Sequence, residues 1–347
     1  MVSETTTTIC VQLRQAETIR RYLSDKKNLR NDLKIIKEGK FIYFPVKSVP
    51  KELKSYKIIK KEFEKRTTKP TSYKEIVSIP DKLKNKLPTS YDVIGDIILV
   101  KLPNDLLEYK KEIGKALLLS NKNIKTVCLS KPVAGELRIR NVAVIAGEKN
   151  TATIHREYGL GFEVDVQKTY FSPRLARERK RIASLVQPGE IVVDMFAGVA
   201  PFSIMIAKYA DPKIIYAIDK NEDAVRFAKQ NIKRNKVLDK IEVIHADAKE
   251  IHTILKKPAD RIIMNLPFSA HMFFTHALKV TKDDSIIHYY DILKEDEIQE
   301  RINKLKKIAV KHKTALTNLN VRKIKTYAPR EFYIGIDITA TKNADVA

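Results

Sequence analysis

The chain has 347 residues, enough for two or three domains with separate cores, and it carries 66 lysines and arginines against 42 acidic residues. No apolar run reaches the length of a membrane span, the N-terminus lacks the apolar core of a signal peptide, and the two distant cysteines form neither a disulfide framework nor a zinc spacing. These features exclude a membrane protein and a secreted disulfide scaffold, and we expect a cytoplasmic protein.

The first half of the chain holds most of the positive charge. Residues 1–180 carry 38 basic and 21 acidic side chains, whereas the remainder carries 28 and 21. An excess of this sign attracts polyanions through phosphate contacts and counterion release. A lysine-rich, solubilising surface would explain the number of lysines but not their excess over acids. We therefore expect a nucleic-acid partner.

Residues 1–67 are predicted to form a small α/β domain. Apolar patterning predicts strands over residues 9–13 and 41–46 and a helix over residues 16–24. Residues 66–72 are polar, contain a proline and have no periodicity, which indicates a linker.

Residues 68–175 are predicted to form a middle α+β domain. We expect one strand over residues 93–100 with a bulge at Gly95, a helix over residues 110–119 and a strand over residues 137–147. Two alternating segments on either side of a glycine-containing turn, residues 153–156 and 162–166, predict a β-hairpin. Ser172 and Pro173 then indicate the N-cap and first position of a helix.

From Glu190 onward strands and helices alternate, which predicts a mostly parallel sheet. The first two strands end in Asp194 and Asp219, and a third is followed by Asn265-Leu266-Pro267. Ligands bind at the carboxyl ends of such strands, where an acid after the second strand can hold ribose hydroxyls. Each acid by itself would be taken for a strand-end cap or a loop acid, but the ordered set favours a nucleoside cofactor.

The turn after the first strand indicates which cofactor. It contains one glycine, Gly198, between Ala197 and Ala200, and lacks the full glycine pattern that a pyrophosphate requires. S-adenosylmethionine (SAM) has no phosphate, so one glycine suffices. These features predict a SAM-dependent methyltransferase.

Five motifs together resemble those of the archaeal and eukaryotic Trm5-type tRNA methyltransferases. They are Tyr170-Phe171-Ser172-Pro173-Arg174 with its continuation to Arg179, and residues 193–202, 265–267, 287–290 and 326–331. The resemblance implies an α/β fold: a Rossmann-like class I SAM-binding domain, residues 176–347, after two smaller RNA-binding domains, residues 1–67 and 68–175. It implies methylation of N1 of guanosine 37 in tRNA, with contacts to the anticodon region and body, by a monomer without an obligate protein partner.

The expected chemistry needs a base and a positive donor, because guanine N1 carries a proton and charge builds on O6 after its removal. The resemblance assigns the base to Glu178 and the O6 donor to Arg138. From the residues alone, Glu178 would be an ordinary acid in a charged helix. Arg138 would be a phosphate contact or a surface strand residue.

The resemblance also implies the remaining site residues. Asn265 is expected to take part in catalysis, and the target base is expected to contact Tyr170, Asn265, Pro267 and Phe268. The cofactor is expected to contact Tyr170, Arg174, Asp194, Phe196, Gly198, Ala200, Ile218, Asp219, Ala246, Asp247, Asn265 and Pro267. The seven histidines show no metal-ligand spacing, and we expect no metal because the methyl group of SAM is already activated.

Phe268 departs from the family pattern, since many relatives have lysine at this position. An aromatic residue here is similar to the Asn-Pro-Pro-Tyr loops that stack on an extruded base. It would suit the archaeal subgroup that also methylates the tricyclic wyosine intermediate imG-14 at C7. Alternatively, the ring packs beneath its loop. Both interpretations stay open.

Three other functions are alternatives to this one. Aminocarboxypropyl transfer to a wyosine precursor uses a similar sheet, but the glutamate at position 178 favours methyl transfer. A non-enzymatic RNA-binding protein would not need the acids at the strand ends. A C5-pyrimidine methyltransferase requires a nucleophilic cysteine, and neither Cys10 nor Cys128 lies in the sheet domain.

Overall fold

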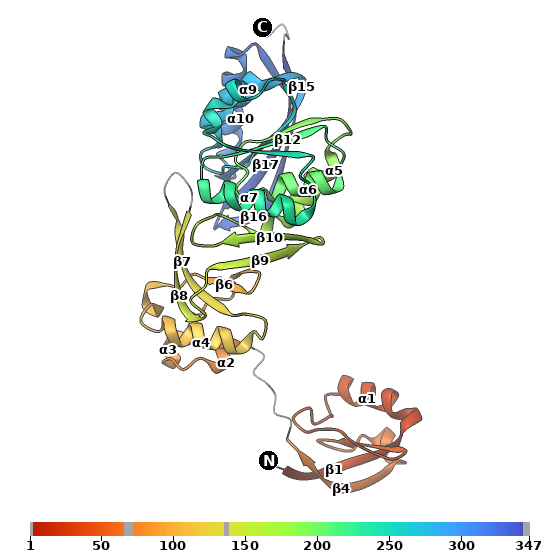
Figure 1. Cartoon of the computed structure of the whole chain (residues 1–347). Coiled ribbons are helices and arrows are strands. Elements are labelled where there is room, and N and C mark those ends of the chain that lie inside the picture. Colours follow the sequence, from red (N-terminus) through yellow and green to blue (C-terminus); the bar gives the residue numbers. More distant parts are fainter. Residues whose placement is uncertain (1–2, 66–71, 135–138, 343–347) are drawn as a thin grey trace. The chain divides into compact units, whose positions relative to one another are not determined.

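The computed structural model describes residues 3–65, 72–134 and 139–342 (Figure 1). Backbone contacts divide the chain into two compact units, Met1–Ile76 and Val77–Ala347, which are described separately below. The predicted linker at residues 66–72 falls almost entirely outside the described residues. The division into domains at residues 1–67, 68–175 and 176–347 stays a prediction.

The first unit is an antiparallel sheet with one covering helix. The strand order is β2-β3-β1-β4, and α1 packs its apolar residues Ile19 and Leu23 into the core. The two predicted strands and the helix are confirmed. β1 begins earlier than expected because the threonine run pairs with β4. The bounds are β1 Ser3–Gln12, α1 Ala16–Asp25, β2 Ile36–Glu38, β3 Phe41–Pro45 and β4 Lys57–Glu64.

The second unit begins with a four-stranded sheet in the order β5-β6-β7-β8. The single strand predicted over residues 93–100 is wrong, because the chain reverses at Gly95 and forms a hairpin. Gly95 has φ of +55°, and an added Cβ would lie 2.1 Å from Oγ1 of Thr153. The bounds are α2 Tyr73–Ile76, which belongs to the first unit, then α3 Asp81–Lys84, β5 Asp92–Ile94, β6 Ile97–Val100, α4 Lys110–Ser120, β7 Thr126–Ala134 and β8 Ile139–Gly147.

A seven-stranded sheet dominates the rest of this unit. Its order is β13-β12-β11-β14-β15-β17-β16, in which the first five strands are parallel and β17 is antiparallel to both neighbours. The order reverses between β11 and β14, which is where open α/β sheets bind ligands. The strand bounds are β11 Ile191–Asp194, β12 Ile214–Asp219, β13 Ile241–His245, β14 Ala259–Met264, β15 Thr281–Lys294, β16 Thr314–Ala328 and β17 Glu331–Lys342.

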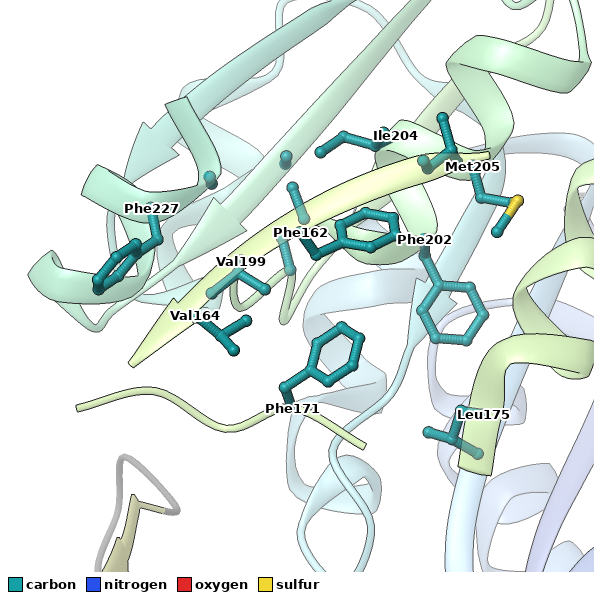
Figure 2. Packing of buried hydrophobic residues seen from close by; sticks show 14 of the residues in the cluster. Phe162, Val164, Phe171, Leu175, Val199, Phe202, Ile204, Met205 and Phe227 are labelled. Atoms are coloured by element: carbon teal, nitrogen blue, oxygen red, sulfur yellow. The ribbon is translucent and has the colours of Figure 1, made fainter. Parts of the chain in front are cut away.

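Helices cover both faces of this sheet, as the doubly wound pattern requires. One core contains Ile182, Phe202 and Phe227 from α5, α6 and α7, and Figure 2 shows part of it. The other contains residues of α8, α9 and α10, among them Phe274 and Leu305. The bounds are α5 Ala176–Leu185, α6 Pro201–Tyr209, α7 Glu222–Asn235, α8 Ile251–Ile254, α9 Phe274–Val280 and α10 Ile298–Lys311.

The predicted hairpin, β9 Ala152–Glu157 and β10 Leu160–Asp165, is confirmed and lies beside α7 (Figure 1). The side-chain amide of Asn231 exchanges hydrogen bonds with the backbone N–H and C=O of Glu163. Asn235 does the same with Gly161. Two asparagines of α7 thus satisfy backbone hydrogen-bonding groups of β10, and these bonds fix the hairpin to the seven-stranded sheet domain.

The segment before α5 begins as a short 3-10 helix, Pro173–Leu175, with proline at its first position as predicted. Ser172 precedes it, but its side chain makes no capping hydrogen bond. Within the described ranges, no helix is long and apolar enough to cross a membrane.

Candidate active site

One large pocket, of about 1120 Å³, opens where β11, β12 and β14 end. It brings together segments that are far apart in the sequence, from the loop before β5 to β17. The predicted site residues that line it are Tyr170, Arg174, Phe196, Gly198, Asp219, Asp247, Asn265, Pro267 and Phe268.

Asp219 joins the ends of β11 and β12. Its Oδ2 accepts a hydrogen bond from the backbone N–H of Gly198 at 2.6 Å, and its Oδ1 accepts one from Asn221 at 2.8 Å. Burial raises the pKa of this carboxyl, although the two N–H groups oppose the shift. A carboxylate fixed in this way retains lone pairs for ribose hydroxyls.

The turn at Gly198 fits a closely approaching cofactor. Its φ is +56°, and an added Cβ would meet only the Tyr170 carbonyl oxygen, at 3.7 Å. On the same side of the pocket, the ring of Phe196 lies edge-on against Phe273, with centroids 5.0 Å apart. Asp247 accepts hydrogen bonds from the backbone N–H of Lys249 and from Lys220 Nζ. The residues present therefore fit SAM, from whose ribose hydroxyls the Asp219 carboxylate would accept hydrogen bonds.

Asn265, directly after β14, faces a different set of groups. The hydroxyl of Tyr333 donates to its Oδ1, which leaves the amide nitrogen as the donor of this side chain. Lys325 Nζ lies 5.1 Å from the centroid of the Tyr333 ring. This part of the pocket offers hydrogen-bond donors and flat apolar surface, as a purine requires.

Phe268 lies at the mouth of the pocket, 47% exposed and with φ of +69°. A positive φ is unfavourable for a bulky residue and is retained where the surroundings fix it. Here the backbone N–H of Phe268 donates to the buried Asp291, and the ring meets Tyr327 edge-on at 5.7 Å between centroids.

Glu178 is buried and does not line the pocket. Its carboxylate accepts hydrogen bonds from Arg181, Arg322 and the hydroxyl of Tyr290. Burial alone would raise the pKa of Glu178, but these three donors together lower it below its usual value. In this arrangement the carboxylate is ionised and fully engaged.

The same two arginines also contact Asp337, whose Oδ1 lies 2.6 Å from Nδ1 of His288. Nε2 of His288 lies 2.7 Å from Arg261. Glu178 is therefore one end of a chain of charged groups between α5 and the central strands.

Other predicted contacts are also not brought into the pocket. Asp194 is fully buried beneath it, with its Oδ2 hydrogen-bonded to Ser203. Ala200, Ile218 and Ala246 support the turn and strands without lining the cavity. Arg138 lies outside the described residues.

Among the pocket-lining groups that the sequence did not predict are Asp92, Arg140, Lys325 and Tyr333. Arg140 follows the predicted Arg138 by two positions, and Tyr333 follows the motif at residues 326–331, so proximity to a motif was the available signal. Lys325 directly precedes the same motif, whereas Asp92 had no such signal, because only the fold brings it to this place.

The strand order, the acid-bound glycine turn and the pocket at the reversal point define a Rossmann-like, class I SAM-dependent methyltransferase. A family model described as "TRM5/TYW2 methyltransferase domain" matches residues 153–317. Models of a TYW2 N-terminal domain and a tRNA methyltransferase 5 N-terminal domain match residues 73–151 and 8–54. The chain belongs to the Trm5-type tRNA methyltransferase family, and the predicted family is confirmed.

The relatives include tRNA (guanine(37)-N(1))-methyltransferase Trm5b of Pyrococcus abyssi, 42% identical over 96% of this chain and 98% of that protein. The Methanocaldococcus jannaschii protein of the same name is 38% identical over 96% and 99%. A tRNA(Phe) (4-demethylwyosine(37)-C(7)) aminocarboxypropyltransferase of M. jannaschii is 39% identical over 71% of this chain and 96% of that protein.

Solved structures agree. The crystal structure of Trm5b from P. abyssi has a TM-score of 0.81 and 41% identity, covering 97% of this chain and 99% of its own. The complex of aTrm5 with tRNALeu also has a TM-score of 0.81, with 37% identity over 96% and 99%. TYW2 of M. jannaschii in complex with AdoMet has a TM-score of 0.57 and 32% identity, over 73% and 100%.

Proposed function

We propose that this chain transfers a methyl group from SAM to N1 of guanosine 37 in tRNA. The observation that carries the proposal is the shared pocket. It joins the cofactor-binding end, at Asp219 and Gly198, to the Asn265-Leu266-Pro267-Phe268 loop. The names of the two Trm5b relatives and the complex of aTrm5 with tRNALeu support this substrate.

In the proposed reaction the target base leaves its stack and enters the pocket beside Tyr170 and Asn265, as base-modifying enzymes generally require. The cofactor supplies an electrophilic methyl group. The Asn265 amide nitrogen orients the base, and Pro267 closes the loop beneath it. These residues would hold N1 in line with the methyl group, which is a large part of catalysis by positioning.

We further propose Glu178 as the acceptor of the N1 proton and Arg138 as the donor to O6. For Glu178 this role needs a change from the arrangement described above. Its carboxylate must exchange at least one hydrogen bond, from Arg181, Arg322 or Tyr290, for a path to the pocket. Arrival of tRNA, a polyanion that competes for arginines, is a physical cause for such a change.

The test uses unmodified tRNA transcripts that carry G, A or inosine at position 37, incubated with SAM and analysed as nucleosides by mass. We expect N1-methylguanosine from the G37 transcript and no product from A37. Asp219→Ala should weaken SAM binding without changing tRNA affinity in the absence of SAM. Methylation at another position, or of the A37 transcript, would contradict the proposal.

A second activity is proposed on the strength of Phe268: methylation of the tricyclic intermediate imG-14 at C7. The half-exposed ring at the pocket mouth offers a stacking face, worth ~1–3 kcal/mol per base, and a tricyclic base offers more area than guanine. A relative named tRNA 4-demethylwyosine(37)-methyltransferase Taw21, from Saccharolobus solfataricus, is 30% identical over 72% of this chain.

Phe268→Lys should lower the rate more on tRNA bearing the tricyclic base than on G37 tRNA. By-products distinguish the remaining alternative, because methyl transfer releases S-adenosylhomocysteine whereas aminocarboxypropyl transfer releases methylthioadenosine. Equal losses on both substrates would leave Phe268 as a packing residue. We also propose that the protein is cytoplasmic and that it acts as a monomer without an obligate protein partner. Sedimentation of the active enzyme tests the oligomeric state.

A further inference from the structure

Three cations from separate elements meet on one side of the pocket. They are Arg140 of β8, Arg174 of the 3-10 helix before α5, and Lys325 of β16. Asp92 of β5 supplies one carboxylate to this group: its Oδ1 lies 2.6 Å from Nε of Arg174 and its Oδ2 3.5 Å from Nη1 of Arg140. One acid thus faces three cations.

The neighbouring Arg179 does not add to the excess, because it forms a buried ion pair with Glu157. Its guanidinium also donates to the carbonyl oxygen of Ser172, which fixes the backbone beside the cations. Lys325 Nζ contacts the hydroxyl of the same Ser172 at 3.5 Å. The cluster is therefore held in place by a rigid, paired support and carries net positive charge.

The cluster borders the place expected for the target base. Arg140 lies over the ring of Tyr170, 5.2 Å from its centroid, and Lys325 lies over Tyr333, which contacts Asn265. Two exposed lysines, Lys101 and Lys131, line the same pocket and extend the positive surface toward solvent. A path of this kind suits a polymer of phosphates better than one isolated carboxylate.

We propose that Arg140, Arg174 and Lys325 bind a backbone phosphate of the flipped tRNA nucleotide, and that Asp92 is the counter-ion which holds these cations until the phosphate arrives. The inference rests on the proposed function, since it takes tRNA as the ligand. Arginine forks and a lysine point charge are the usual phosphate ligands.

The protonation of Lys325 agrees with this arrangement. Burial, together with the nearby Arg174, Arg140 and Arg179, lowers the pKa of Lys325 to about 8, while Asp92 opposes the shift. A phosphate beside the ammonium group restores its pKa toward the usual value. Binding of tRNA near pH 8 should therefore take up about half a proton at this lysine, and the uptake should vanish below about pH 6.5.

The first experiment measures tRNA binding to the full chain by calorimetry, in buffers of different ionisation enthalpy and at several salt concentrations. Lys325→Met should weaken binding several-fold, lower the slope of log K against log salt by about one, and abolish the proton uptake. Lys325→Arg should restore affinity and slope but not the uptake, since arginine does not titrate. Lys323→Met is the matched control. It removes a lysine of the same strand that pairs with Glu295 outside the pocket, and should leave the proton uptake and SAM affinity unchanged.

The second experiment removes the charge from the ligand. A methylphosphonate at the phosphate 5′ or 3′ of nucleotide 37 should weaken binding to wild-type enzyme at one of the two positions, and should have little further effect on Lys325→Met. If neither position matters, or if Lys325→Met binds tRNA with the wild-type slope and uptake, the phosphate site is refuted. A loss of SAM affinity alone would assign the cluster to the cofactor carboxylate and also overturn it.

Failure of the phosphate site can be distinguished from failure of the proposed function. The binding measurements do not depend on turnover, so a chain that binds as expected but fails to methylate G37 retains the phosphate site and loses the proposed activity. If the wild-type chain methylates G37 and Lys325→Met binds tRNA with the wild-type slope and proton uptake, the proposed activity stands and the phosphate site is refuted.

Discussion

The backbone N–H of Phe268 donates a hydrogen bond to Oδ1 of Asp291 at 2.8 Å, and this contact joins the loop after β14 to the neighbouring strand β15. Asp291 is completely buried, and its other oxygen accepts from Tyr289 and Arg301. A buried acid that is paired with Arg301 therefore holds Phe268 in a backbone conformation that costs ~1–3 kcal/mol for most residues.

Asp291→Asn should release this loop. The amide keeps the shape of the carboxyl but removes the charge opposite Arg301, at a cost of about 1–3 kcal/mol in unfolding free energy. Because the single amide oxygen cannot accept from both Phe268 and Arg301, the loop loses part of its support, and the single-turnover rate should fall more than tenfold, an order-of-magnitude estimate for misplacement of reacting groups. SAM affinity should not change, since Asp291 does not touch the cofactor end.

The control is Glu295→Gln, which alters an exposed acid just after the same strand. It should leave the stability and the rate as they are. Rapid quench with labelled SAM and thermal unfolding supply both readouts. A destabilised Asp291→Asn enzyme with an unchanged rate would show that the loop is positioned by other contacts.

The network around Glu178 allows its catalytic and structural contributions to be separated. Glu178 and Asp337 share Arg181 and Arg322. Glu178→Gln and Asp337→Asn should therefore each cost about 1–3 kcal/mol, less than a fully buried pair because both arginines reach solvent. Only Glu178→Gln should lower the methyl-transfer rate by ~10²–10⁴, the usual worth of a general base.

The pH dependence of stability is a further check on this network. The pKa values of Glu178 and Asp337 are both depressed in the fold. Their contribution to stability is complete above the pKa of the unfolded carboxyls and disappears as the pH falls through the lower, folded values. Equal rate losses in the two variants, in proportion to their loss of stability, would remove Glu178 from the proton transfer.

The sequence predicted the parts of the site that lie at the ends of periodic elements. Asp219, Gly198 and Asn265 follow apolar strands, and parallel strands place their carboxyl ends at one edge, so their meeting in one pocket follows from the pattern. The hairpin beside α7 was predicted for the same reason, from alternation on both sides of a glycine turn.

What the pattern could not supply is the pairing between distant segments. Lys325 and Asp92 belong to different sheets, and Glu178 obtains two of its partners from β15 and β16, more than a hundred residues away. The reversal at Gly95 was missed because one glycine in an apolar run predicts a bulge as readily as a turn.

Asp194 presents a buried carboxyl whose ionisation opposes folding. Burial raises its pKa to about 7, against hydrogen bonding from Ser203, and its Oδ1 finds no partner within the described structure. The unfolded chain ionises this group near the ordinary value of 3.8, so its effect is to lower stability as the pH rises from about 4 to about 7, after which the effect is constant.

Asp194→Asn should remove this dependence and gain on the order of 2–4 kcal/mol at pH 8 relative to pH 4. Urea unfolding at both pH values measures it. Asp211→Asn, an exposed acid after α6, should show no such difference. A wild-type stability that does not fall relative to Asp194→Asn between these pH values would mean that the carboxyl is ionised in the fold throughout.

The first unit, Met1–Ile76, offers a prediction about how tRNA is recognised. It has its own apolar core, built on Ile9, Leu23 and Phe44, and residues 1–76 carry 19 basic and 9 acidic side chains. The aminocarboxypropyltransferase of M. jannaschii aligns with 71% of this chain over 96% of its own length, so this relative has a shorter chain.

Deletion of residues 1–76 should therefore leave a folded methyltransferase that binds SAM with unchanged affinity, because every described residue of the pocket lies beyond residue 77. Binding of tRNA should weaken at least tenfold at physiological salt, and the slope of log K against log salt should become smaller, since phosphate contacts of the basic unit are lost. Filter binding over a salt series, together with calorimetry of SAM, measures both effects.

A minihelix that contains only the anticodon stem and loop provides the control. If the first unit contacts the tRNA body, the intact and shortened enzymes should bind the minihelix equally well. Equal affinity for full-length tRNA would instead show that the first unit takes no part in recognition.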